Sequence, residues 1–198
     1  MRRRAWALAA AAVAVALLPT AGALAAPRTA AMAIDANTGA VLHNYSGDEK
    51  RYPASLTKMM TLYMAFELIE LGRMSYDTKI TMTEHAAAAT PSKLGLKAGS
   101  QIRAIDAIKA LVTKSANDVA IALAEHIGGT ESNFARLMTR KARDIGMKST
   151  VFKNASGLPD DEQFTTARDM LTLALRLQDE CPQHYKVFKT RSFSYAGK

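Results

Sequence analysis

The sequence predicts a fold of the α/β class, α+β type, in which a cluster of helices packs on an antiparallel sheet. Two β-prone stretches, residues 30–35 and 40–45, flank Ala36-Asn37-Thr38-Gly39, where Asn and Gly tolerate turn geometry, so a hairpin is predicted. Several segments with helical spacing of apolar residues follow, and residues 187–195 are expected to be extended. Because a lone hairpin is marginally stable in water, we expect the sheet to be incomplete here and to gain strands from chain beyond Lys198.

The first helix is predicted from Leu56 to Ile69, where nearly every residue is apolar. A helix that is apolar on almost every side belongs in the interior of a protein. Residues 74–101 show weak periodicity and contain Pro91, Gly95 and Gly99, which predicts a loop with a short strand or two.

Two further helices are predicted around a short joint. Apolar residues recur at helical spacing from Ile105 to Val112, in a helix that ends near Lys114, and again from Ala120 to Ile127. Gly128-Gly129 stops the second of these helices. The residues between them therefore lie in an interhelical joint.

The second half of the chain contains two more segments that are typical of helices. Thr130 is a capping residue with Glu131 in the first turn, and Gly146 closes this helix. The next helix is expected from about Ala167 to Leu177, with one residue of Thr165-Thr166 as its cap.

Residues 1–25 are predicted to be an export signal. Arg2-Arg3-Arg4 form a basic start, Ala5 to Leu18 is an apolar run, and Ala23-Leu24-Ala25 is a small-x-small cleavage site. The apolar run is shorter than the roughly 20 residues that a membrane-spanning helix needs. We therefore expect an exported, periplasmic or cell-envelope protein whose mature domain comprises residues 26–198.

Composition excludes several classes of function. The chain has a formal net charge of +8, and removal of the signal leaves 23 basic against 18 acidic side chains, scattered without interleaved aromatics, which argues against nucleic-acid binding. Cys181 is the only cysteine, so no internal disulfide forms, and we expect it to be a small packing residue. The histidines lack metal-ligand spacing; they are His43, His85, His126 and His184.

Ser55 and Lys58 form a candidate nucleophile and base. A serine hydroxyl is a poor nucleophile until a base removes its proton. Residues three apart lie on one helix face, so the Lys58 amine can reach the Ser55 hydroxyl. Burial beside the apolar helix would lower the lysine pKa toward the value that a base needs. The backbone N–H of Ser55 at the helix start is free to point at an oxyanion.

Ser115 and Asn117 supply a second pair of polar groups in the interhelical joint. A hydroxyl can relay a proton, and an amide can bind a substrate carbonyl. Taken alone, Ser-x-x-Lys is a common chance pattern, and Ser and Asn often cap helices. The two motifs together favour a catalytic interpretation.

These motifs resemble those of the active-site serine penicillin-binding enzymes. The surrounding residues are similar to the low-molecular-mass D-alanyl-D-alanine carboxypeptidases over essentially the whole mature chain, with the penicillin-binding, serine β-lactamase-like transpeptidase fold. The segments that carry the resemblance are Pro53 to Thr61, Lys114 to Asp118, Ala142 to Met147, Asn154 to Leu158 and Thr165 to Met170.

The resemblance implies a two-step acyl transfer on peptidoglycan stem peptides. Ser55 would attack the penultimate D-alanine carbonyl and release terminal D-alanine, and water would then free the enzyme. By the same resemblance Lys58 is the base, Ser115 relays a proton toward the leaving amine, and Asn117 holds the acyl side chain. Penicillins and other β-lactams would acylate Ser55. No metal or organic cofactor is implied, and association with the membrane surface would require a C-terminal segment not present here.

One element of the family pattern is not found. The family's third motif, Lys-Thr-Gly on a sheet strand, binds the substrate carboxylate and leads to the second oxyanion donor. Lys189-Thr190-Arg191 is a near match, but Arg replaces the glycine that permits close approach of a substrate. We therefore interpret the chain as C-terminally shortened and expect low activity from residues 26 to 198 alone, because losing one oxyanion donor typically costs about 10²–10³ in rate.

Two other functions remain open at this point. A serine β-lactamase shares the fold and the nucleophile but uses an added carboxylate to deacylate; Glu131 and Glu162 are available acids, although neither lies in a motif for that role. A different class is an inactive, truncated envelope protein that binds glycan or penicillin without turnover.

Overall fold

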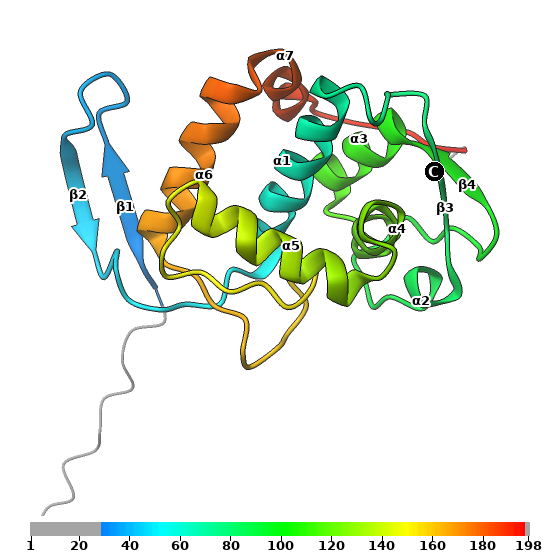
Figure 1. Ribbon diagram of the computed structural model, residues 1–198, viewed down its shortest axis with the longest axis horizontal. Helices are drawn as coiled ribbons and strands as arrows, with labels where there is room; N and C mark the ends of the chain where they lie inside the picture. The colour runs from blue at the N-terminus through cyan, green and yellow to red at the C-terminus, as the bar shows by residue number, and fades with distance from the viewer. Residues whose placement is uncertain (1–28, 197–198) are drawn as a thin grey trace, which may run out of the picture.

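The computed structural model describes residues 29–196, which form two small antiparallel sheets and a cluster of helices (Figure 1). The predicted export signal, residues 1–25, lies outside the described residues. Within the described part, no helix is long and apolar enough to span a membrane. The elements are β1 (Ala31–Ile34), β2 (Val41–Tyr45), η1 (Ala54–Leu56), α1 (Thr57–Glu70), β3 (Lys79–Thr81), α2 (Glu84–Ala87), β4 (Gln101–Arg103), α3 (Ala104–Lys114), α4 (Asn117–Gly128), α5 (Glu131–Asp144), α6 (Ala167–Glu180), α7 (Pro182–Tyr185) and η2 (Lys186–Lys189).

The predicted hairpin is confirmed as β1 and β2. The strands are antiparallel, with Ala31 opposite Tyr45. The Asp35 carboxylate closes the turn because Oδ1 accepts hydrogen bonds from the backbone N–H groups of Asn37 (2.9 Å) and Thr38 (2.8 Å). Local side-chain bonds of this kind stabilise tight turns.

The helices cover only part of this hairpin. β1 packs against α6, whereas every residue of β2 is exposed, including Val41 (52%) and Leu42 (69%). A hollow of about 660 Å³ lies between β1, the chain that precedes η1, and α6. Figure 1 shows the hairpin at one end of the molecule, beside α6. That further strands pair with it stays a prediction.

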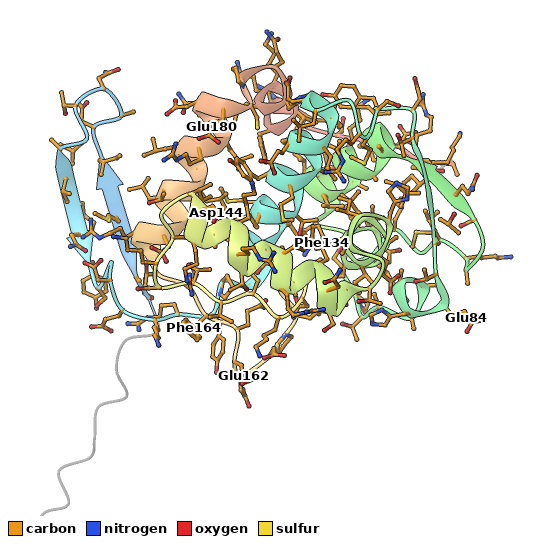
Figure 2. The ribbon with its side chains drawn as sticks, in the orientation of Figure 1. Glu84, Phe134, Asp144, Glu162, Phe164 and Glu180 are labelled. Carbon is orange, nitrogen blue, oxygen red and sulfur yellow. The ribbon has the colours of Figure 1, made fainter. Side chains whose placement is uncertain are left out.

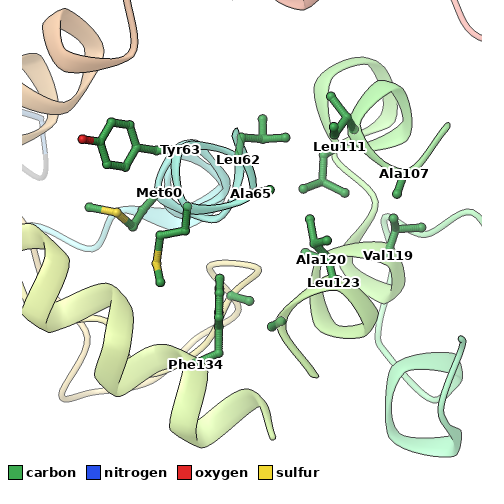
Figure 3. Close-up of a cluster of buried hydrophobic side chains, with 14 of the residues drawn as sticks. Met60, Leu62, Tyr63, Ala65, Ala107, Leu111, Val119, Ala120, Leu123 and Phe134 are labelled. Atoms are coloured by element: carbon green, nitrogen blue, oxygen red, sulfur yellow. The ribbon is translucent and has the colours of Figure 1, made fainter. Parts of the chain in front are cut away.

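Helix α1 forms the centre of the helical cluster, as its apolar sequence predicts. It packs against α4, α5 and α6, and its buried residues lie on all its faces. Figure 3 shows Leu111 of α3, Leu123 of α4 and Phe134 of α5 around it. Such enclosure makes α1 a rigid base for the residues at its N-terminus.

The segment between α1 and α3 contains the short strands predicted there. β3 and β4 pair antiparallel, with Ile80 opposite Ile102, and both side chains are buried. Sequence analysis missed α2, a single turn capped by the Thr83 hydroxyl, which accepts a hydrogen bond from Ala86 N at 2.9 Å.

Two threonines cap the later helices. The Thr130 hydroxyl accepts from Asn133 N at the start of α5, and the Thr166 hydroxyl accepts from Asp169 N at the start of α6, both at 3.1 Å. The choice between Thr165 and Thr166 is thereby settled. Helix α6 also continues three residues past the predicted end, to Glu180.

The prediction of an extended segment at residues 187–195 is wrong. Residues 186–189 form the 3₁₀ turn η2, and no strand follows within the described residues. The cause is tertiary packing: His184 in α7 stacks on Phe66 at 4.9 Å between ring centroids, and Val187 and Phe188 then pack against the core. Burial of these side chains outweighs their β propensity.

Replacing Phe134 by Ala should lower the free energy of unfolding by about 3–5 kcal/mol, because this ring is 0% exposed and fills the space beside α1. Phe188→Ala, which truncates a partly buried ring, should cost less. Urea unfolding of both variants measures the difference; equal losses would contradict the central place given to Phe134.

Candidate active site

A serine hydroxyl and a lysine amine meet where α1 begins. Ser55 lies in η1 and is exposed, whereas Lys58 is the second residue of α1 and only 4% exposed. Lys58 Nζ is 3.4 Å from Ser55 Oγ. Ala54, just before the serine, has a φ of 46°, in the left-handed region that is unfavourable for a residue with a Cβ atom. Neighbouring segments must therefore hold this turn in place.

Two more oxygen atoms contact the lysine amine. Lys58 Nζ donates hydrogen bonds to Asn117 Oδ1 at 2.8 Å and to the backbone carbonyl of Ser156 at 2.5 Å. Both acceptors are neutral, and within residues 29–196 no carboxylate forms an ion pair with Lys58. The site thus binds the amine without stabilising a positive charge as strongly as a carboxylate would.

Burial lowers the pKa of Lys58 to about 8, because an ammonium ion loses hydration in the interior. A neutral lysine amine has two N–H groups and one lone pair. Asn117 and Ser156 take the two N–H groups, so the lone pair is left for the hydroxyl proton of Ser55. This geometry suits a general base.

Ser115 and Asn117 lie at the α3–α4 joint, between the two predicted helices. Ser115 ends α3 in a left-handed conformation with φ 55°, and Asn117 begins α4. Within the described part of the chain the Ser115 hydroxyl has no hydrogen-bond partner, whereas Asn117 Nδ2 donates to Thr90 O at 2.9 Å. The structure thus brings Asn117 into contact with Lys58 and leaves the Ser115 hydroxyl free for another group.

Asp118 fixes the segment that runs beside this joint. The side chain is 0% exposed, and its two oxygens accept hydrogen bonds from Leu94 N (2.9 Å) and Gly95 N (2.8 Å). Asn117 N adds a bond to Ser92 O at 2.7 Å. Because each lost partner would leave a buried polar group unsatisfied, the joint and this segment form one unit.

Sequence analysis did not assign Ser156 to the site. Its carbonyl reaches Lys58 because Asn154 organises a turn: Asn154 Oδ1 accepts from Ser156 N at 3.2 Å and from Gly157 N at 2.7 Å. Only the backbone of Ser156 contacts the amine, so the identity of the side chain carries no signal in a single sequence. The Asn-x-x-Gly spacing is the one local indication of this turn.

Gly157 packs directly against the turn that presents Ser55. A Cβ atom on Gly157 would lie 1.8 Å from the carbonyl oxygen of Ala54, and its φ is 85°. Only glycine fits both this contact and this conformation. The contact holds Ala54 in its unfavourable conformation.

The other residues considered from the sequence have no hydrogen bond or ion pair to Ser55 or Lys58 in the part of the chain that the structure describes. Glu162 pairs with Lys153 at 2.7 Å, and Figure 2 shows it at the outer tip of a loop. Glu131 accepts a hydrogen bond from Ala155 N at 2.9 Å. Lys189-Thr190-Arg191 begins at the last residue of the 3₁₀ turn η2 and is not in a strand. Cys181 is buried, which raises the pKa of its thiol to about 11 and agrees with a packing role.

Comparison with known proteins identifies the family. The family model described as D-alanyl-D-alanine carboxypeptidase, Peptidase_S11, matches residues 19–198. The chain belongs to this family. It is similar to D-alanyl-D-alanine carboxypeptidase DacF from Bacillus subtilis (strain 168), with 35% identity over 74% of this chain and 38% of the relative.

Two crystal structures of similar proteins have the same fold. The carboxypeptidase DacD from Francisella tularensis gives a TM-score of 0.79 with 40% identity, over 90% of this chain and 43% of that one. Penicillin binding protein 5 from Haemophilus influenzae gives 0.80 with 32% identity, over 84% and 49%. The chain therefore spans less than half the length of these relatives, and the predicted fold class is confirmed.

Gly157→Ala should destabilise the chain by about 2–5 kcal/mol, because it combines a strained backbone with a clash against Ala54. Gly72→Ala is the matched control: Gly72 also has a positive φ, 67°, but a Cβ atom there meets nothing within 4 Å. Its cost should be only the backbone strain, about 1–2 kcal/mol.

Chemical denaturation of the two variants beside the unchanged chain gives both values. A loss for Gly157→Ala no larger than that for Gly72→Ala would mean that the contact between Gly157 and Ala54 does not restrain the turn.

Proposed function

We propose that the chain carries the nucleophile and base of a serine-type D-Ala-D-Ala carboxypeptidase that removes terminal D-alanine from peptidoglycan stem peptides. The supporting observation is the buried Lys58 amine, which has neutral acceptors on two sides and the Ser55 hydroxyl on the third. Membership of the carboxypeptidase family gives the reaction class. The activity, substrate and partners of the whole protein are part of this proposal.

In the first step, neutral Lys58 accepts the proton of Ser55 as Oγ attacks the carbonyl carbon of the penultimate D-alanine. The backbone N–H of Ser55 donates to the oxyanion that forms, where preorganised donors stabilise developing charge. As this intermediate collapses, the C–N bond breaks, and the proton held by Lys58 passes through Ser115 to the amine of the leaving D-alanine, so that the acyl group stays on Ser55 as an ester. Water then hydrolyses the ester and restores Ser55.

Asn117 has two roles in this proposal. One N–H of its amide is used by Thr90 O and the amide oxygen by Lys58, which leaves the second N–H for a carbonyl on the acyl side of the substrate. The Lys58 contact ties the position of this binding group to that of the base. No metal or organic cofactor takes part.

Penicillins and other β-lactams are proposed inhibitors because their amide can acylate the same serine. The likeness to a penicillin binding protein of Haemophilus influenzae supports this. The enzyme is proposed to act after export by residues 1–25, in the periplasm or cell envelope, on cell-wall peptide and not on nucleic acid.

A serine β-lactamase would need a carboxylate near Ser55 to assist deacylation, and no contact of Glu131 or Glu162 supports that role. Glu131 uses one oxygen for Ala155 N, and Glu162 pairs with Lys153 and is exposed. Within the described residues, neither of these acids has a hydrogen bond or ion pair to Ser55 or Lys58. The carboxypeptidase function is therefore the one we retain.

A fluorescent penicillin should label the chain on Ser55, as shown by proteolysis and mass spectrometry of the labelled peptide. Ser55→Ala should abolish the label, whereas Ser132→Ala, which changes an exposed serine on α5, should leave it unchanged. Hydrolysis of a D-Ala-D-Ala peptide should be lost in the same variant. Label on another residue, or none on the unchanged chain, would overturn the proposal.

The rate constant of acylation should rise with pH through a midpoint near the Lys58 pKa of about 8. The sign follows from the role of the amine: below this pKa the ammonium has no lone pair, and at pH 6 only about 1% of the amine is neutral. Stopped-flow labelling between pH 6 and 10 measures the profile. Lys58→Met should remove this rise and slow acylation by about 10²–10⁴; a flat profile for the unchanged chain would exclude Lys58 as the base.

A further inference from the structure

We propose that Glu131 is a positioning residue for the base: it holds the Ala155–Ser156 backbone so that the Ser156 carbonyl accepts an N–H of Lys58. This inference rests on the proposed function, because it concerns the same acyl transfer. It assigns a purpose to a buried carboxylate on α5 that the proposed chemistry itself does not use.

The turn that contains Ser156 is tied to the helices at successive backbone groups. Ala155 N donates to Glu131 Oε1 at 2.9 Å, and Ala155 O accepts from the Thr61 hydroxyl at 2.8 Å. The next carbonyl, that of Ser156, accepts from Lys58 at 2.5 Å. Glu131 thus anchors the turn to α5, while Thr61 and Lys58 anchor it to α1.

On the side that faces Glu131, a hollow interrupts the packing around the turn. A hollow of about 270 Å³ lies there, and Glu131, Asn154 and Ser156 are among the residues that line it, together with His85. Beside such a hollow, a hydrogen bond from a fixed helix adds a restraint on the backbone to the one that Asn154 supplies. The Glu131 carboxylate supplies it, and an ionised acceptor makes a stronger bond than a neutral one.

Neighbouring groups hold Glu131 in turn. Its side chain is 13% exposed, and Glu131 Oε2 lies 3.7 Å from His85 Nε2 on α2. His85 Nδ1 contacts Glu125 Oε1 on α4 at 2.9 Å, and the Thr83 hydroxyl contacts the other Glu125 oxygen. Burial raises the pKa of Glu131; the Ala155 N–H and His85 oppose this, and the Glu125 carboxylate adds to the rise. Its place in the first turn of α5 also favours the carboxylate form.

The Ser156 carbonyl affects catalysis because it helps to set the direction in which the lone pair of the Lys58 amine points. With Ser156 and Asn117 both accepting, the amine has one orientation and its lone pair meets Ser55. If the Ser156 carbonyl moves away, the amine can rotate, and fewer molecules hold the lone pair toward the hydroxyl. Misplacement of about 1 Å in a reacting pair can cost up to about 10² in rate.

Three substitutions of Glu131 test separately the length of its side chain, its hydrogen-bond acceptor and its negative charge. Glu131→Ala removes the acceptor; Glu131→Asp keeps the charge but is one methylene too short to reach Ala155 N; Glu131→Gln keeps an oxygen acceptor at full length without the charge. Asp144→Ala is the control, since Asp144 is an exposed acid at the opposite end of α5 (Figure 2).

The measurement is the rate of fluorescent-penicillin acylation against penicillin concentration, which separates the acylation rate constant from the dissociation constant of the initial complex. We expect Glu131→Ala and Glu131→Asp to lower the rate constant about 10- to 100-fold with a nearly unchanged dissociation constant. Glu131→Gln should stay within about threefold of the unchanged chain, as should Asp144→Ala.

The results for these variants test the positioning role of Glu131 separately from the proposed function. If the unchanged chain is labelled on Ser55 but Glu131→Asp acylates at the normal rate, the positioning role is wrong while the proposed function stands. If Glu131→Gln falls as far as Glu131→Asp, the hydrogen-bond acceptor is not what matters and the inference fails. Absence of label from the unchanged chain overturns the proposed function itself. Should Glu131→Ala not fold, the Asp and Gln variants alone give the comparison.

Discussion

The burial of one lysine amine is the constraint on which the rest of the site depends. An ammonium ion without a carboxylate partner is unfavourable in a protein interior. Burial therefore lowers the pKa of the lysine and favours its neutral amine. Lys58 is 4% exposed, and both of its carbonyl partners are neutral. The same arrangement that makes the charged lysine unfavourable therefore makes a base available near neutral pH.

Three segments far apart in the sequence must meet to keep that arrangement. Helix α1 brings Lys58, the α3–α4 joint brings Asn117, and the turn at residues 154–158 brings the Ser156 carbonyl. Each segment is bonded to something besides the lysine: Asn117 to Thr90, and Ala155 to Glu131 and Thr61. These bonds hold the acceptors in place independently of the lysine, so the acceptors are preorganised to bind its amine.

The sequence predicts the local part of this site and not the rest. Ser55 and Lys58 are three residues apart on one helix, so their contact follows from helix geometry, as do the caps at Thr130 and Thr166. The contacts of Lys58 with Asn117 and Ser156 join residues 59 and 98 positions apart, and no periodicity encodes them. The extended segment expected at residues 187–195 failed for a related reason: His184 and Phe188 are bound to the helical core, and tertiary packing decided their conformation.

The site and the hairpin are held by different parts of the fold. Lys58 and its partners lie among α1, α4 and the turn after α5, whereas β1 packs against α6. Two links join these regions: β1 and α1 both pack against α6, and the chain between β2 and η1 runs from the hairpin to the site. In that chain Arg51 pairs with Thr165 in an antiparallel bridge, and Pro53 leads into the Ser55 turn. Because Gly157 also contacts Ala54, the position of the nucleophile depends on both regions, while the position of the base depends on the helical cluster and the turn at residues 154–158.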